Sequence, residues 1–157
     1  MQTDIGKKAA GEKAAGYIKP GMTVGLGTGS TAYYTILRIG ELVREGLEIK
    51  AVATSAQSEI LAREQQIPLV DFDKVDKIDL DIDGADEADA QLQLIRGGGG
   101  ALLREKIIAA ASTEMLVVID ENKLVKTLGK FPLPVEVAVF AWELTFKQLL
   151  ALGARPV

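Results

Sequence analysis

The sequence predicts an α/β fold in which a parallel sheet carries helices on both faces. Segments with helical periodicity alternate with short apolar segments along most of the chain, which is the pattern of β-α-β units. Two of the predicted strands lead into glycine-rich turns that precede a helix. The chain has 157 residues, 48% of them apolar, so it can bury a core of its own.

In the first half, a helical pattern over residues 3–18 ends at Pro20 and Gly21. An apolar strand at 22–26 leads into a glycine loop. A second helix follows over 31–46, whose apolar residues include Ile36, Ile39 and Leu42. A strand at 49–54, a helix at 56–65 and a strand at 68–72 complete this half.

In the second half, residues 78–82 alternate aspartate with apolar side chains, and residues 91–95 alternate again. A helix is predicted over 102–112 and a buried strand over 115–119. We interpret residues 1–128 as one Rossmann-like domain.

The character of the chain changes around Gly129. Residues 130–134 contain two prolines, 135–140 resemble a strand, and 141–152 resemble a helix. This segment is too short to bury a core alone. We interpret 129–157 as the first part of a small, incomplete α/β domain.

Composition excludes several classes of function. The net charge is −4 and the pI is about 5.0, so the chain lacks the broad basic surface that nucleic-acid binding needs. Cysteine and histidine are both absent, which leaves proton transfer to Asp, Glu, Lys or Tyr. The N-terminus lacks a signal-peptide core, and no apolar run approaches the roughly 20 residues of a membrane span. We expect a cytoplasmic protein with no membrane partner.

The loop at 25–31 reads Gly-Leu-Gly-Thr-Gly-Ser-Thr. Glycine permits a tight turn, and the N-terminus of the next helix offers N–H groups and a partial positive charge to an anion. The hydroxyls of Thr28, Ser30 and Thr31 could donate as well. The loop lacks the lysine of a P-loop and the third glycine of a dinucleotide fingerprint, so a sugar phosphate or similar small anion is favoured. A tight turn with a Ser or Thr cap is the alternative.

The segment at 83–87 reads Asp-Gly-Ala-Asp-Glu. Asp83 and Asp86 follow a strand end, where ligands bind in open α/β sheets, and carboxylates there can bond sugar hydroxyls. Alternatively, each caps local backbone in an Asx-turn. We interpret Glu87 and Asp89 as solvated charges, and expect Asp79 and Asp81 to be exposed.

Four consecutive glycines at 97–100 precede the helix at 102–112, which makes a second candidate anion site. On a helical wheel the buried stripe comprises Leu103, Ile107, Ala110 and Ala111, and Glu105 lies away from it. Glu105 could face a cleft or could simply complement the helix dipole. Arg96 and Lys123 could bind an anion or could be solvated surface charges.

Together these motifs resemble the ribose-5-phosphate isomerases of type A. The resemblance is carried by GLGTGST at 25–31, DGADE at 83–87, GGGGALLREK at 97–106 and LGKFPLPVEV at 128–137, in order along the chain. It implies interconversion of ribose 5-phosphate and ribulose 5-phosphate in the pentose phosphate pathway, without metal or organic cofactor.

The resemblance implies a role for each matching residue. Glu105 matches the proton acceptor, and Asp83, Asp86 and Arg96 assist the chemistry. The implied substrate-binding residues are Thr28, Gly29, Ser30, Thr31, Asp83, Gly84, Ala85, Asp86, Arg96, Gly97, Gly98, Gly99 and Lys123. One carboxylate can carry the proton between C1 and C2 through an enediol(ate), a contribution of roughly 10²–10⁴-fold, while a cation stabilises the oxyanion.

The chain departs from the family at two points. The family has lysine where this chain has Arg96, which keeps its charge but does not readily give up a proton. Family members also continue well past position 157, which leaves open a fragment, a truncated chain or a degenerate copy, and the main sheet of this chain would then expose an unpaired edge. A homodimer is implied for full-length members, and the short C-terminus leaves it open for this chain.

Two other functions remain open at this stage. One is a non-catalytic sugar-phosphate binder or an impaired pseudoenzyme, suggested by Arg96 and the short C-terminus. The other is a transferase acting on acyl-CoA, which can share this kind of sheet and would use a glutamate nucleophile.

Overall fold

A four-stranded parallel sheet forms the centre of the molecule, in a computed structural model that describes residues 2–156. The strand order is β2-β1-β3-β6, and a short antiparallel pair, β4 and β5, lies apart from this sheet. The strands are β1 (Thr23–Leu26), β2 (Lys50–Ala53), β3 (Ile78–Asp83), β4 (Glu87–Ala88), β5 (Leu94–Ile95) and β6 (Ser112–Val117). The helices are α1 (Gln2–Ala15), α2 (Ser30–Arg44), α3 (Ala56–Glu64), α4 (Leu102–Ala111) and α5 (Trp142–Ala151), with 3₁₀ turns at Phe72–Lys74 and Glu121–Lys123.

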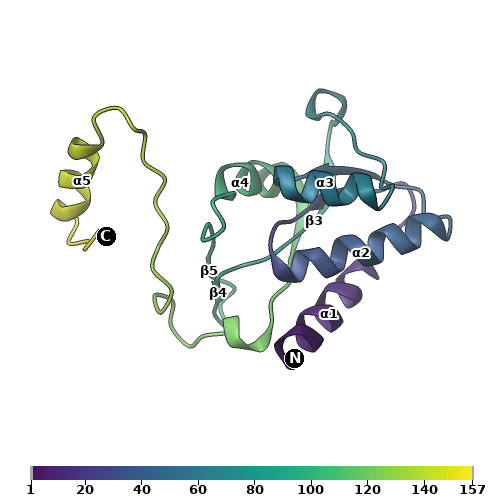
Figure 1. Ribbon diagram of the computed structural model, residues 1–157, viewed down its shortest axis with the longest axis horizontal. Helices are drawn as coiled ribbons and strands as arrows, with labels where there is room; N and C mark the ends of the chain where they lie inside the picture. The colour runs from purple at the N-terminus through teal and green to yellow at the C-terminus, as the bar shows by residue number, and fades with distance from the viewer. Residues whose placement is uncertain (1, 157) are drawn as a thin grey trace.

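Helices cover both faces of the sheet, as the alternating pattern predicts (Figure 1). On one face, Leu26, Leu80 and Ile82 join the main core with side chains from α1, α2 and α3. On the other face, α4 packs on β3 and β6, and its Ile108 is fully buried. The helix α1 lies against α2, and Figure 1 shows the two helices together.

The topology places a crevice between β1 and β3. From β1 the chain crosses over to β2 on one side of the sheet, and from β3 it crosses over to β6 on the other side. Ligands in open α/β sheets bind where the strand order reverses in this way, outside the carboxyl ends of the strands. Both singled-out motifs, the loop after Leu26 and the carboxylates from Asp83 onward, begin at this point.

Three strand predictions need correction. Residues 68–72 form only an isolated bridge, from Leu69 to Ala51, and then a 3₁₀ turn, because Pro68 cannot donate to a ladder. The strand predicted as buried at 115–119 is β6, which begins at Ser112 and is half-exposed because it lies at the sheet edge. Residues 135–140 form no strand in the described part of the chain.

The last part of the chain leaves the body of the molecule. After the 3₁₀ turn at Glu121–Lys123, an extended segment leads away to α5, which stands apart from the sheet (Figure 1). Its junction is anchored by Glu87, whose carboxylate accepts the N–H groups of Gly129 at 2.7 Å and Phe131 at 2.6 Å. The division at residue 128 stays a prediction, although the chain does change course close to it.

Among residues 2–156, no helix combines the length and the apolar character needed to cross a bilayer.

Candidate active site

The glycine-threonine loop connects β1 to α2 within the crevice. Gly27 is required there, because a Cβ at this position would lie 2.5 Å from the Cα of Asp83 on the neighbouring strand. Gly29 has a φ of +107°, a conformation that side chains other than glycine rarely adopt. It precedes α2 without a side-chain cap of its own, so the first N–H groups of α2 face the crevice available to an anion.

Asp83 ends β3 and is fully buried. One carboxylate oxygen accepts the N–H of Thr28 at 2.8 Å and of Gly84 at 2.7 Å. The other oxygen is ion-paired to the guanidinium of Arg96. Asp83 therefore joins the glycine loop to the charged side of the crevice.

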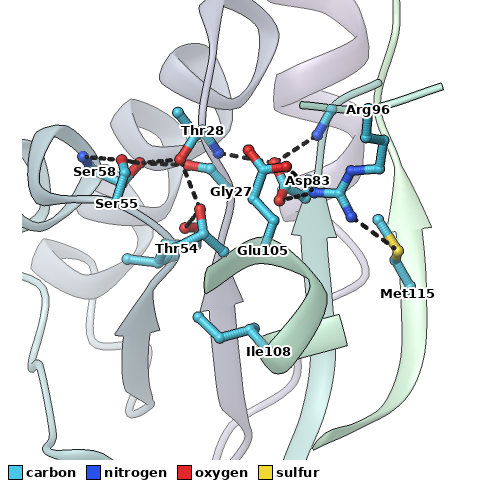
Figure 2. Close-up of polar contacts among 12 residues, drawn as sticks. Gly27, Thr28, Thr54, Ser55, Ser58, Asp83, Arg96, Glu105, Ile108 and Met115 are labelled. Carbon is cyan, nitrogen blue, oxygen red and sulfur yellow. Dashed lines mark hydrogen bonds and ion pairs between the residues drawn. The ribbon is translucent and has the colours of Figure 1, made fainter. Parts of the chain in front are cut away.

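Arg96 lies between two carboxylates. Its Nη2 contacts both Asp83 and Glu105, the latter at 3.1 Å from Oε2, and Figure 2 shows the three side chains pointing toward one another. Its Nη1 lies 3.7 Å from the sulfur of Met115 on β6. The side chain is 9% exposed, so Arg96 is a buried partner of two acids rather than a solvated charge.

Glu105 lies in the first turn of α4 and is buried, which corrects the helical-wheel prediction. The buried face of α4 comprises Glu105 and Ile108, whereas Leu103 is 63% exposed and Ile107 is 55% exposed. A helical wheel assumes that the side of the helix facing the sheet is apolar. Here that side of α4 faces Arg96 and Asp83, and the Glu105 carboxylate pairs with the Arg96 guanidinium.

Burial raises the pKa of Glu105 above the usual range of a glutamate, and the negative charge of Asp83 raises it further, while Arg96 opposes both. Burial also raises the pKa of Asp83, against the opposing effects of Arg96 and of the N–H groups of Thr28 and Gly84. A carboxylate with a raised pKa, next to a fixed cation, is suited to act as a base near neutral pH.

The second glycine loop is held by Asp86. Its Oδ2 accepts the N–H of Gly98 at 2.8 Å, and a Cβ on Gly98 would lie 2.7 Å from the ring of Phe131. Gly97 and Gly100 have φ values of +106° and +73°. Backbone conformation therefore favours glycine at Gly97 and Gly100, and the side chains of Phe131 and Asp86 lie close to Gly98.

These groups enclose a cavity of about 250 Å³. Its lining includes most of the predicted site residues, namely Thr28, Gly29, Ser30, Thr31, Gly84, Ala85, Asp86, Arg96, Gly97, Gly99, Glu105 and Lys123. Asp83 lies directly behind the lining, and Gly98 lies outside it while contacting Asp86. The Nζ of Lys123 lies 5.9 Å from the ring centroid of Phe131.

Sequence reasoning missed part of the lining. Val118, Ile119 and Asp120 follow β6 and complete the cavity wall. Asp120 accepts the N–H of Asn122 at 2.9 Å, which shapes the turn that carries Lys123. The rule that singled out Asp83, a carboxylate just beyond a strand end, could have found Asp120 too.

Three carboxylates expected at the surface are buried. Asp81 is 0% exposed, because its side chain points toward α4 on the same face of β3 as Asp83. Glu87 is buried because it binds the backbone at Gly129 and Phe131. Asp89 is buried because it accepts the N–H groups of Gln91 and Gln93 in the turn between β4 and β5.

Comparison with known proteins places this geometry in context. Residues 50–157 match the model of the family described as ribose 5-phosphate isomerase A, or phosphoriboisomerase A. The ribose-5-phosphate isomerase A of Bacillus mycoides is 55% identical over 149 residues, which cover 95% of this chain and 67% of the relative.

Solved structures agree with the sequence comparison. A D-ribose-5-phosphate isomerase in complex with phospho-erythronic acid superposes with a TM-score of 0.95 at 42% identity, covering 99% of this chain and 69% of the other. The ribose 5-phosphate isomerase A of Neisseria gonorrhoeae gives a TM-score of 0.93 at 43% identity, covering 98% and 68%.

Proposed function

The chain belongs to the ribose-5-phosphate isomerase A family and is an isomerase of that type, and from this premise we propose that Glu105 moves a proton between C1 and C2 of ribose 5-phosphate. The observation that carries the proposal is the contact of one guanidinium with two buried carboxylates. Arg96 joins Asp83 and Glu105 at the wall of the cavity that the glycine loop also lines.

The phosphate is assigned to the loop after β1. The N–H groups of Gly29, Ser30 and Thr31, at the start of α2, supply donors and the positive end of the helix dipole. Lys123 adds a cation to the lining of the same cavity. In support, a relative of similar fold has been solved with phospho-erythronic acid, a phosphorylated sugar acid.

The reaction proceeds by proton transfer alone. In the open-chain aldose, the Glu105 carboxylate takes the proton from C2, and the electrons of that bond form the C1–C2 double bond while the carbonyl oxygen becomes an oxyanion. Arg96 lies where its charge stabilises that oxyanion. The same carboxyl group then returns the proton to C1, and the hydroxyl proton of O2 passes to O1, which gives the ketose.

Asp83 and Asp86 have supporting roles in this scheme. Asp83 keeps Arg96 beside Glu105 and keeps the Thr28 N–H in place. Asp86 lines the cavity and can bond sugar hydroxyls during ring opening. Arg96 itself is assigned no proton transfer, because a guanidinium does not lose its proton in proteins.

The impaired-enzyme alternative is favoured by one contact. Glu105 is ion-paired to a cation that must remain charged, so its carboxylate has to engage the substrate from within that pair.

The test is turnover of ribose 5-phosphate by the whole chain in D₂O, followed by NMR. We expect ketose to form and deuterium to appear at C1, since a carboxyl proton exchanges with solvent between abstraction and return. Ketose that gains no deuterium at C1 even after many reversible turnovers would contradict the enediol(ate) scheme and would favour a hydride shift. Tight binding of ribose 5-phosphate without any ketose would instead identify a binding protein.

A further inference from the structure

Four hydroxyl groups from three different segments lie close together at the glycine-threonine loop that follows β1 (Figure 2). Thr28 belongs to the loop itself. Thr54 and Ser55 follow β2, and Ser58 lies in the first turn of α3. Thr54 is 0% exposed and Ser58 is 4% exposed, so these are interior hydroxyls whose bonds need an account.

Two of these hydroxyls bond to backbone carbonyl oxygens, which only accept, so the hydroxyl is the donor in both cases. Thr54 donates to the carbonyl of Leu26 at 3.0 Å, and Ser58 donates to the carbonyl of Gly27 at 2.6 Å. The oxygens of Thr28 and Thr54 are 2.7 Å apart and share a hydrogen bond in which either can donate. The Ser58 oxygen lies 3.3 Å from that of Thr28 and 3.0 Å from that of Ser55.

The Thr28 hydroxyl is therefore bonded to hydroxyls inside the protein as well as lining the cavity. Through Thr54 and Ser58 it is connected to two carbonyl groups of the loop's own backbone.

The bonded carbonyls belong to two consecutive peptide units, and each unit is held on both sides. The Gly27 carbonyl shares a rigid plane with the Thr28 N–H, which donates to Asp83 at 2.8 Å. The Leu26 carbonyl shares a plane with the Gly27 N–H, which donates to Ile82 at 2.9 Å. The two peptide units are thus bonded to Thr54 and Ser58 on one side and to β3 on the other.

We propose that Thr54 and Ser58 are positioning residues for phosphate binding, an inference that rests on the proposed function. They hold the two peptide planes at which the loop leaves β1, and so aim the N–H groups of residues 29–31 at the phosphoryl group. Neither residue touches the substrate. Their loss should weaken binding of the phosphate and leave the proton transfer at C1 and C2 largely intact.

The test compares Thr54→Val and Ser58→Ala, which remove the hydroxyls, with two controls. Thr54→Ser keeps the hydroxyl. Thr35→Val removes another buried threonine hydroxyl, one on α2 that has no hydrogen-bond partner among the described residues. The two controls separate loss of the bonds from general disturbance of the core.

We expect KM for ribose 5-phosphate to rise about five- to tenfold in Thr54→Val and Ser58→Ala, while kcat of these variants changes by less than about twofold. In both controls we expect KM to change by less than about twofold. The dissociation constant of inorganic phosphate, measured by NMR, should rise in parallel. Thermal unfolding shows which variants remain folded. If Thr54→Val does not fold, Ser58→Ala, which is the smaller change, still tests the proposal.

Equal KM and phosphate affinity in Thr54→Val, Ser58→Ala and Thr35→Val would overturn the proposal. So would a fall in kcat with KM unchanged, because that result would place the hydroxyls in the chemical step. The phosphate measurement needs no turnover, so it tests the positioning role even if the wild-type chain forms no ketose.

Discussion

At the scale of single residues, Arg96 is the side chain on which the arrangement depends. Within residues 2–156 it is the one cation in contact with both Asp83 and Glu105, and its planar fork is larger than an ammonium group. A lysine at this position, which the resemblance implies for the family, would place a compact charge, able to donate a proton, in the same space. Arginine therefore preserves the electrostatics of the site and restricts its proton chemistry.

Replacing Arg96 tests this view. We expect Arg96→Lys to raise kcat/KM for ribose 5-phosphate by about tenfold, equivalent to roughly 1.4 kcal/mol of transition-state stabilisation. The reason is that an ammonium can reach the substrate oxygen without remaining bridged between two carboxylates. Arg104→Lys, on the exposed side of α4, is the matched control. An unchanged or lower kcat/KM in Arg96→Lys would refute the prediction.

At the scale of elements, the packing of α4 on β3 contains a buried acid without a partner. Asp81 is 0% exposed, and neither of its carboxyl oxygens has a hydrogen bond among the described residues. Burial and the charge of Asp83 raise the pKa of Asp81 to about 7, with Arg96 opposing and Glu105 adding to the shift. The carboxyl group in this interface is therefore neutral below about pH 7 and becomes charged above it.

The sign of the effect on stability follows from the two pKa values. The unfolded chain releases the Asp81 proton near pH 4, whereas the folded chain retains it until about pH 7. Unfolding therefore releases a proton between these values, and the contribution of Asp81 to stability falls as the pH rises through that window. Above it, the folded protein holds a buried charge.

Asp81→Asn removes this titration. We expect the difference in free energy of unfolding, variant minus wild type, to become more positive by roughly 2 to 3 kcal/mol from pH 5 to pH 8, at about 1.4 kcal/mol per pKa unit. Urea unfolding at the two pH values measures the difference. Asp73→Asn, on an exposed 3₁₀ turn, controls for the loss of one negative charge. A difference that is the same at both pH values would contradict this account.

The elements also show what sequence reasoning can and cannot establish. Helices α2 to α5 were predicted to within two residues at each end, because their apolar periodicity and flanking residues are local signals. The strand predicted at 135–140 failed because a strand needs a neighbour, which the described residues do not provide. The wheel misplaced Glu105 because hydrophobic periodicity cannot anticipate a buried acid paired with a distant arginine.

The site shows the same division. The glycine loops and the carboxylates after β3 were predictable from composition and position, since both kinds of motif follow strand ends. The hydroxyls of Thr54 and Ser58 were not, because their importance lies in bonds to residues 28 and 31 positions away along the chain. Asp81 was misjudged because strict alternation says which face it occupies and not that α4 covers that face.

At the scale of the whole molecule, the chain combines a packed α/β body with an extended C-terminal segment. The segment exposes large apolar side chains, among them Val139, which is 90% exposed, and Phe140, which is 93% exposed. The edge of β6 has no strand partner among residues 2–156. The chain spans about two thirds of the length of the curated relatives it matches.

The cavity nonetheless draws its walls from within the body. Its lining comes from segments after β1, β3, β5 and β6 and from the start of α4, all of which lie before the extended segment begins. The contribution of the later residues is indirect, because Phe131 contacts Gly98 and Lys123 at the rim. All the residues to which the proposed chemistry assigns a role therefore lie before the extended segment.

The most direct test of the central claim is kcat for ribose 5-phosphate in Glu105→Gln. The substitution keeps the size of the side chain and removes the base, so we predict a loss of roughly 10²–10⁴-fold in kcat with a much smaller change in KM. Glu64→Gln, at the exposed end of α3, should match the wild type. A Glu105→Gln variant that is folded and retains kcat within about twofold would contradict the account, because its proton would then have another carrier.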